Sequence, residues 1–206
     1  MPPGQMYSNY TFVTSLEAKT VPPTLPALVG LSHHRWVIPL VAAMGSGQRF
    51  AVLCSLLDIN RQSLRRALAA TDELGLTLLN PGYGHPLRPE YILTPRGKAI
   101  APQSRDVVRA AEDGGWSDLL AKKWSLPVLA AVRMGAARYS EIEAALSTAS
   151  PRAIARSLEA LADAGCIRRE LFDERPPRPS YSVTPEGQHL AQCGVALADA
   201  AGRVLG

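Results

Sequence analysis

Long polar side chains that can hydrogen-bond to nucleic acid bases stand one helical turn apart in two segments of the chain. Arg152 and Arg156 form one pair, and Gln62 and Arg66 form the other. Arginine can donate two hydrogen bonds to O6 and N7 of guanine, and glutamine can pair with N6 and N7 of adenine. Because residues four apart share a helix face, the spacing predicts two helices that each present one face to duplex DNA.

The alternative for both segments is an ordinary solvated helix face that carries arginine salt bridges. Only four of the 22 basic residues are lysine, which leaves 18 arginines, and a GC-rich genome also produces this bias. The formal charge of +4 and the pI near 9.1 are compatible with a polyanionic partner but do not require one. The local context of the arginines is therefore the better guide.

The signals around Arg152 and Arg156 indicate a helix over residues 151–164. Ser150 is a favourable N-cap, Pro151 suits the first helical position, and Gly165 ends the segment. Residues 166–169 and 181–183 then predict two strands, and the polar, proline-rich residues 173–179 between them predict a loop. A helix followed by this hairpin is the order of a winged helix, in which the loop is the wing.

The same order of signals occurs twice, at an offset of 88 to 90 residues. The matched positions are Trp36 with Trp124, Arg49-Phe50 with Arg138-Tyr139, Arg66 with Arg156, and Thr94-Pro95 with Thr184-Pro185. In the earlier copy we expect a leading helix over 50–58, a second helix over 61–74 with Asn60 as its N-cap, and a strand over 76–79. The chain is therefore predicted to contain two copies of one domain.

The residues expected to contact DNA lie on the second helices, at their N-caps and in the wings, where contacts to phosphate are expected. In the first copy they are Asn60, Arg61, Gln62, Arg65, Arg66 and Arg88. In the second copy they are Ser150, Arg152, Arg156, Arg168, Arg169, Arg175 and Arg178. Three acidic residues in the second wing partly cancel its charge, and the first wing carries one arginine, so the copies are expected to contribute unequally.

Five short stretches, residues 123–129, 138–142, 150–152, 176–178 and 181–187, together resemble the HxlR-type winged helix-turn-helix family of bacterial transcriptional regulators. The resemblance covers most of residues 113–190. It implies sequence-specific binding of double-stranded DNA in the cytoplasm, without catalytic activity or a cofactor. Terminal helices form the homodimer in that family, so a tandem chain could build the dimer internally, as a monomer with a pseudo-dimer, or could dimerise further.

One departure from the family concerns sensing, because many relatives carry a Cys-Pro pair ahead of the first helix. The equivalent positions fall near Pro23 and Ala111, so neither copy has the thiol. The three cysteines, Cys54, Cys166 and Cys193, are odd in number and widely spaced, which predicts neither disulfides nor a metal cluster. They are expected to pack as inert core residues.

The predicted fold is mainly α with small β wings (α+β), in two tandem winged helix-turn-helix domains. Residues 1–30 are expected to form an arm or a partly disordered tail, residues 31–112 the first domain, and residues 113–206 the second. A helix is expected over 97–112 beyond Pro102, a joint between domains at 113–115, and a C-terminal helix over 187–204.

Several classes of function find no support in the sequence. No nucleophile motif, catalytic triad or glycine-rich phosphate loop is present, and His33-His34 has no second cluster at metal-ligand spacing. No apolar run approaches the length of about 20 residues needed to span a bilayer. We therefore expect no enzyme activity, no cofactor, no metal and no membrane.

Trp36 and Trp124 occupy equivalent positions and are expected to pack in the two cores, although aromatic residues near a twofold interface can also line a ligand pocket. This leaves two alternatives to a DNA-binding regulator. One is a protein that binds hydrophobic small molecules or drugs on a winged-helix scaffold, and the other is a protein-docking scaffold in a transcription assembly. A small hydrophobic effector is compatible with the first of these and with the regulator.

Overall fold

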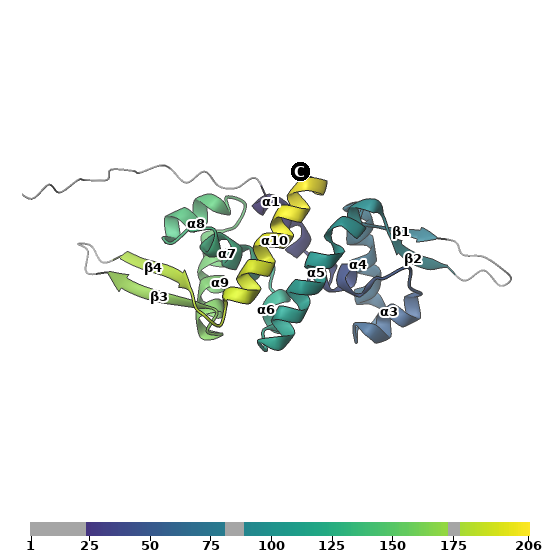
Figure 1. Ribbon diagram of the computed structural model, residues 1–206, viewed down its shortest axis with the longest axis horizontal. Coiled ribbons are helices and arrows are strands. Elements are labelled where there is room, and N and C mark those ends of the chain that lie inside the picture. The colour runs from purple at the N-terminus through teal and green to yellow at the C-terminus, as the bar shows by residue number, and fades with distance from the viewer. Residues whose placement is uncertain (1–23, 81–88, 173–177) are drawn as a thin grey trace, which may run out of the picture.

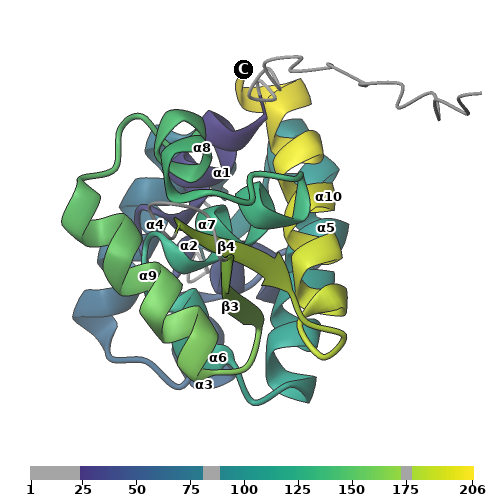
Figure 2. The same cartoon turned by 90° about the vertical axis from the view of Figure 1, so that its left-hand side faces the viewer.

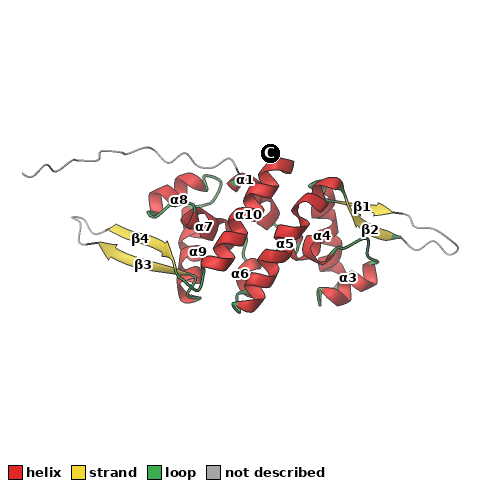
Figure 3. Cartoon of the chain, in the orientation of Figure 1, coloured by secondary structure: helices red, strands yellow, loops and turns green. Residues whose placement is uncertain are grey.

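The computed structural model describes residues 24–80, 89–172 and 178–206, and within these ranges it has two similar series of elements (Figures 1 and 3). The first series is α1 (Leu25–Ser32), α2 (Val37–Ala43), α3 (Phe50–Leu56), α4 (Arg61–Glu73), β1 (Thr77–Asn80), β2 (Glu90–Leu93) and α5 (Pro95–Asp113). The second is α6 (Ser117–Leu120), α7 (Ser125–Arg133), α8 (Tyr139–Ala145), α9 (Pro151–Asp163), β3 (Ile167–Phe172), β4 (Arg178–Val183) and α10 (Gln188–Leu205). The described part of the chain is thus mainly helical, with small antiparallel hairpins.

Each hairpin is a two-stranded antiparallel sheet. In the first, Thr77 pairs with Leu93 and Asn80 with Glu90; in the second, Ile167 pairs with Val183 and Phe172 with Arg178. Each hairpin follows a glycine with positive φ, Gly75 at 65° and Gly165 at 72°. Such a glycine ends a helix without the steric cost that other residues incur in the left-handed region, which confirms the sequence-based ends of α4 and α9.

The expected arm over residues 1–30 is wrong for its last residues, while residues 1–23 lie outside the described ranges. α1 begins at Leu25, and Leu25, Leu28 and Leu31 are each at most 1% exposed. Pro26 lies in the first turn of this helix, where its missing N–H removes no hydrogen bond. The last residues of the expected arm are therefore part of a buried helix.

α5 begins seven residues before Pro102, although the sequence analysis placed regular helix only beyond that proline. Pro95 occupies the first turn, and the Thr94 side chain accepts a hydrogen bond of 3.1 Å from the Gly97 N–H. Pro102 is exposed within the helix. α5 packs against α10 and α2, and it has buried residues on both sides of the proline, such as Ile100 and Val107, so tertiary packing outweighs a local helix-breaking signal.

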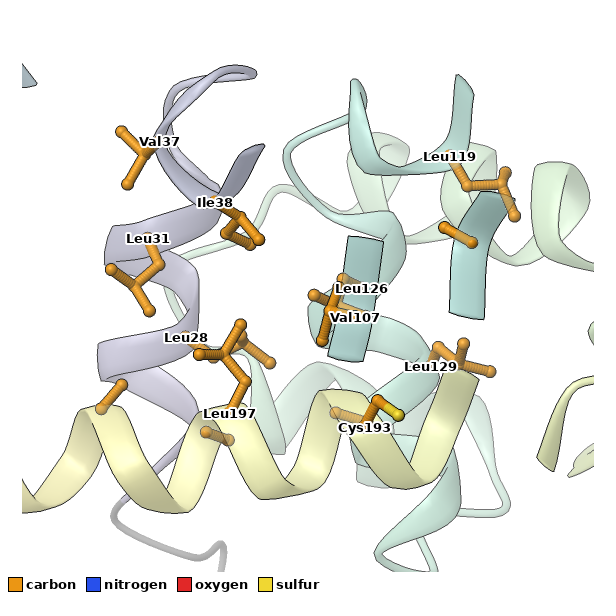
Figure 4. Packing of buried hydrophobic residues seen from close by; sticks show 14 of the residues in the cluster. Leu28, Leu31, Val37, Ile38, Val107, Leu119, Leu126, Leu129, Cys193 and Leu197 are labelled. Atoms are coloured by element: carbon orange, nitrogen blue, oxygen red, sulfur yellow. The ribbon is translucent and has the colours of Figure 1, made fainter. Parts of the chain in front are cut away.

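The two series meet at the centre of the molecule, where α5 and α10 lie side by side, and the hairpins point away from each other at the two ends (Figures 1 and 2). One continuous cluster of buried residues runs through both series. Leu28 and Leu31 of α1, Val107 of α5 and Leu197 of α10 all belong to it (Figure 4). The shared core joins the two series.

Small residues are frequent among the buried residues of the two central helices. Ala198, Ala200 and Ala201 of α10 are buried, as are Ala101 and Ala110 of α5, while Gly194 of α10 faces Leu126 and Ala130 of α7. None of the described helices has the length and apolar character required to cross a membrane.

Replacement of Leu197 by alanine should destabilise the whole chain rather than one half of it. Leu197 is 0% exposed on the helix that joins the two series, so Leu197→Ala should lower the free energy of unfolding by about 2–5 kcal/mol. Urea denaturation followed by circular dichroism measures this change. Leu171→Ala is the control, because Leu171 is 67% exposed and its loss should change stability by about 0.5 kcal/mol or less. Equal losses of stability in the two variants would contradict the burial of Leu197 in a core shared by both series.

Candidate nucleic-acid interface

α4 presents a row of long polar side chains because its N-cap and its buried face fix its orientation. The Asn60 Oδ1 atom accepts a hydrogen bond of 2.8 Å from the Ser63 N–H. Leu64, Ala67 and Leu68 are buried. The exposed residues of this helix include Arg61, Gln62, Arg65 and Arg66. The four predicted contact residues of α4 therefore project from the core toward solvent, as a partner would require.

α9 has the same construction with fewer polar side chains. The Ser150 Oγ atom accepts a hydrogen bond of 3.3 Å from the Ala153 N–H, and Ile154, Leu158 and Leu161 are buried. Arg152 and Arg156 are exposed. Ser150 and Asn60 thus serve as helix caps, and contact between these side chains and DNA stays a prediction.

An aromatic residue that the sequence analysis did not single out lies beneath the N-terminal end of α4. The guanidinium carbons of Arg61 and Arg65 lie 5.8 and 5.9 Å from the centre of the Phe50 ring. At these distances cations are attracted to the negative face of an aromatic ring. Phe50 therefore restrains two of the predicted contact residues, and Tyr91 of β2 flanks it with ring centres 6.4 Å apart.

The equivalent aromatic residue of the second series is Tyr139. Its hydroxyl donates a hydrogen bond of 3.1 Å to the carbonyl oxygen of Pro151 at the start of α9. Burial is the largest cause that raises the pKa of Tyr139, with the charge of Glu143 next. The repeat offset that pairs Phe50 with Tyr139 was the signal that could have identified both residues as supports for the helices.

In both series, hydrogen bonds of one threonine hydroxyl attach the hairpin to the helix that follows it. The hydroxyls of Thr94 and Thr184 each donate a bond of 2.6 Å, to the carbonyl oxygens of Gly75 and Gly165 respectively. Each hydroxyl also accepts a bond of 3.1 Å, from the N–H of Gly97 or Gly187. The repeated Thr-Pro motif therefore connects three points: the end of one helix, the base of the hairpin and the start of the next helix.

The described part of the second hairpin is more basic than that of the first. Arg168 and Arg169 are exposed on β3, and an ion pair of 3.6 Å joins Arg168 to Glu170. In the first series Glu90 of β2 lies 3.9 Å from Arg49. The predicted contact residues Arg88 and Arg175 lie outside the described residues, and Arg178 is described only as a backbone position of β4.

Trp36 and Trp124 stand at equivalent positions, immediately before α2 and α7. The Arg35 guanidinium carbon and the Lys123 Nζ atom each lie 4.8 Å from the centre of the neighbouring indole ring. Trp36 lines a cavity of about 430 Å³ and Trp124 lines another of about 810 Å³. Both tryptophans also pack against the core. They lie at two separate cavities rather than together in one.

The cysteines and histidines form no metal site within the described ranges, where no three His, Cys, Asp or Glu side chains lie close enough to share an ion. Burial raises the pKa of the Cys166 thiol to about 11, and burial followed by the charge of Asp106 raises the pKa of Cys193. The charge of Lys123 is the largest cause that lowers the pKa of His33. Cys54 is half-buried.

Comparison with known proteins places the second series in a family. The model of the HxlR-like helix-turn-helix family matches residues 119–205, which extend from α6 to the end of α10. The HTH-type transcriptional regulator YvaP of Bacillus subtilis is 38% identical over 74 residues, which is 36% of this chain and 68% of the relative. The chain belongs to the HxlR-like helix-turn-helix family. The family model does not extend to the first series.

In two further relatives the match covers a smaller share of the relative's own length. The HTH-type transcriptional regulator YtfH of Escherichia coli is 34% identical over 77 residues, or 37% of this chain and 61% of the relative. A regulator of the same type from Methanothermobacter thermautotrophicus is 36% identical over 68 residues, or 33% of this chain and 52% of the relative. No solved structure gives a significant match. The match to the HxlR-like family thus depends on sequence alone.

A methyl group added at the base of either hairpin should destabilise the folded protein. A Cβ atom at Gly187 would fall on the carbonyl oxygen of Cys166, and one at Gly97 would fall on that of Leu76. Gly187→Ala and Gly97→Ala should each lower the free energy of unfolding by about 1–3 kcal/mol. Thermal denaturation measures the effect. Gly30→Ala is the control, since nothing lies within 4 Å of a Cβ atom there; equal melting temperatures for all three variants would refute the close approach.

The thiols should differ in reactivity in the folded protein. A pKa of about 11 leaves the Cys166 thiol protonated at pH 8, and only the thiolate is an effective nucleophile. Between pH 7 and 9, iodoacetamide should therefore label half-buried Cys54 first and should label Cys166 only after unfolding in urea. Peptide mass spectrometry measures the order. Labelling of Cys166 in the native protein as fast as that of Cys54 would contradict its burial.

Proposed function

We propose that the chain is a transcriptional regulator that binds double-stranded DNA through α4 and α9, as a pseudo-twofold module within one polypeptide. The observation that carries this proposal is the match of residues 119–205 to the HxlR-like helix-turn-helix family, together with the same order of helices and hairpin in residues 37–113. In this proposal residues 31–112 and 113–206 are two winged helix-turn-helix domains. The protein acts in the cytoplasm of a bacterium, without catalysis or a cofactor.

The packing at the centre of the molecule supports the pseudo-twofold arrangement. α5 follows the first hairpin, α10 follows the second, and these two equivalent helices pack against each other. α1 and α6, the short helices that precede Trp36 and Trp124, each contact the other series. α1 packs on α10, and α6 packs on α5. In Figure 1, α3 and α8 lie at opposite corners, as a twofold axis along the viewing direction requires. A homodimer assembled from two such units would have the same exchange of contacts.

The two halves are proposed to bind DNA in different ways. α4 offers three arginines and Gln62 from one helix, whereas α9 offers Arg152 and Arg156 and is followed by the arginines of β3. Arginine and glutamine at the start of a helix suit base edges in the major groove, while basic wings contact phosphates. The preferred site is therefore an imperfect inverted repeat whose half-sites are about 34 Å apart, one turn of B-DNA.

This proposal predicts a salt-dependent DNA complex with two protected segments per chain. The logarithm of affinity should fall as the logarithm of salt concentration rises, with a slope of about −0.9 for each neutralised phosphate. Arg66→Ala and Arg156→Ala should each relax sequence preference at one half-site, at a cost of about 1–3 kcal/mol. Hydroxyl-radical footprinting and competition with random duplex measure these effects on fragments selected from genomic DNA.

Two further variants serve as references. Arg169→Ala should weaken binding to all sequences alike, because a wing contact to phosphate carries no sequence information. Arg203→Ala removes an exposed charge near the end of α10, away from α4 and α9, and should leave binding unchanged. Protection of a single segment per chain would show that only one copy contacts DNA, and the absence of binding at low salt would refute the regulator itself.

A further inference from the structure

A cavity of about 430 Å³ lies between α2, α5, α6 and the C-terminal end of α3. Its volume falls within the range typical of sites for small molecules. Its walls come from both series, because α6 leads into the second copy. None of its lining residues belongs to α4, α9 or the hairpins, so the cavity is distinct from the proposed DNA interface.

Three guanidinium groups line the cavity, and none of them is paired with a carboxylate of the described residues. Arg105 and Arg109 stand one turn apart on α5, and Arg35 belongs to the segment before α2. All three are exposed, and none forms an ion pair within 4.0 Å with a carboxylate of the described residues. The Arg35 guanidinium instead lies over the Trp36 ring. The fork of hydrogen-bond donors on Arg105 and Arg109 is thus free to bind an anion.

Much of the remaining lining of the cavity is apolar and partly exposed. Leu56 lines the cavity and is 57% exposed. Trp36, Val108 and Leu120 are half-buried there and pack against the core. An occupant with an apolar body would cover this surface and remove it from water, which is the dominant favourable term in most binding.

We propose that this cavity binds an amphipathic organic anion, a small molecule with an aromatic body and one carboxylate or sulfonate group. Arg105 and Arg109 donate hydrogen bonds to the anionic group, since a guanidinium group can donate two parallel hydrogen bonds to two oxygens of one anion. The aromatic body lies against Leu56 and Val108. Glu112 and Asp118 also line the cavity, and against three arginines they leave a net positive charge that disfavours a cation.

The larger cavity beside Trp124 has no comparable charge preference. Lys122, Lys123 and Arg156 line it, but so do Asp118, Glu159 and Asp163. Its charges therefore balance, and Arg156 already belongs to the proposed DNA-contacting helix. The cavity beside Trp36 is the one whose charge and apolar surface together define a ligand class.

Occupation of the cavity should also alter the placement of α4. Leu56 and Leu57 stand directly before the turn into α4, where Asp58 has a positive φ of 48°. α5 and α6 form the other wall and connect to the second series. A ligand that contacts both walls therefore changes the separation of α4 and α9, which must match the repeat of B-DNA. This regulatory step depends on the proposed DNA-binding function, whereas ligand binding does not.

The binding site can be tested with probes of matched shape. 8-Anilinonaphthalene-1-sulfonate should fluoresce on binding the folded full-length chain, and 2-naphthoate should displace it about tenfold more effectively than neutral 2-naphthalenemethanol. The variant with both Arg105→Gln and Arg109→Gln should bind the sulfonate about tenfold more weakly. The control removes two exposed charges elsewhere, Arg96→Gln with Arg203→Gln, and should bind normally; circular dichroism checks that both variants fold.

The outcomes separate the site from its regulatory effect. Equal displacement by the acid and the alcohol, or equal affinity in both double variants, would overturn the anion site. Saturating 2-naphthoate should change the affinity of the unaltered protein for selected DNA and leave that of the Arg105→Gln, Arg109→Gln variant unchanged. An unchanged affinity in both would overturn the coupling. Absence of any DNA binding without 2-naphthoate would instead refute the proposed function, and the fluorescence result would stand independently.

Discussion

The close packing of α5 against α10 is the contact on which the rest of the structure depends. These helices end the two series and pack against each other, and alanines are frequent among their buried residues. Because α1 and α6 each pack on the terminal helix of the other series, each series buries part of its apolar surface against the other. The burial of apolar area that stabilises the fold therefore also sets the separation of α4 and α9.

Around this centre the chain builds the same local arrangement twice and varies its exposed chemistry. Thr94 and Thr184 form hydrogen bonds of matching length at the two hairpins, and Phe50 and Tyr139 support the first turns of α4 and α9. These supporting contacts are similar because they maintain the geometry. The exposed side chains on the two helices and hairpins differ, and only such side chains can give two half-sites different sequence preferences.

The cavity beside Trp36 lies in the connections between the repeated units. Its lining includes Arg105 and Arg109 of α5 and Leu56 at the end of α3, so it spans the joint on which the spacing of α4 and α9 depends. Free guanidinium groups beside an exposed leucine make a poor packing interface but a suitable site for an amphipathic anion. A ligand can shift the equilibrium between two arrangements of the protein only by binding one of them more tightly than the other. A ligand in this cavity would contact both α5 and the end of α3, so its affinity would depend on how these elements are arranged.

The sequence by itself determined the local features of this protein. The caps Asn60 and Ser150, the positive-φ stops Gly75 and Gly165, and the order of helix and hairpin followed from short-range patterns, because each depends on residues within one or two turns. Only the tertiary structure showed that α1 is a buried helix, that α5 continues through Pro102, and that Arg105 and Arg109 face the end of α3. These features depend on contacts between residues far apart in the chain, for which one sequence carries no periodic signal.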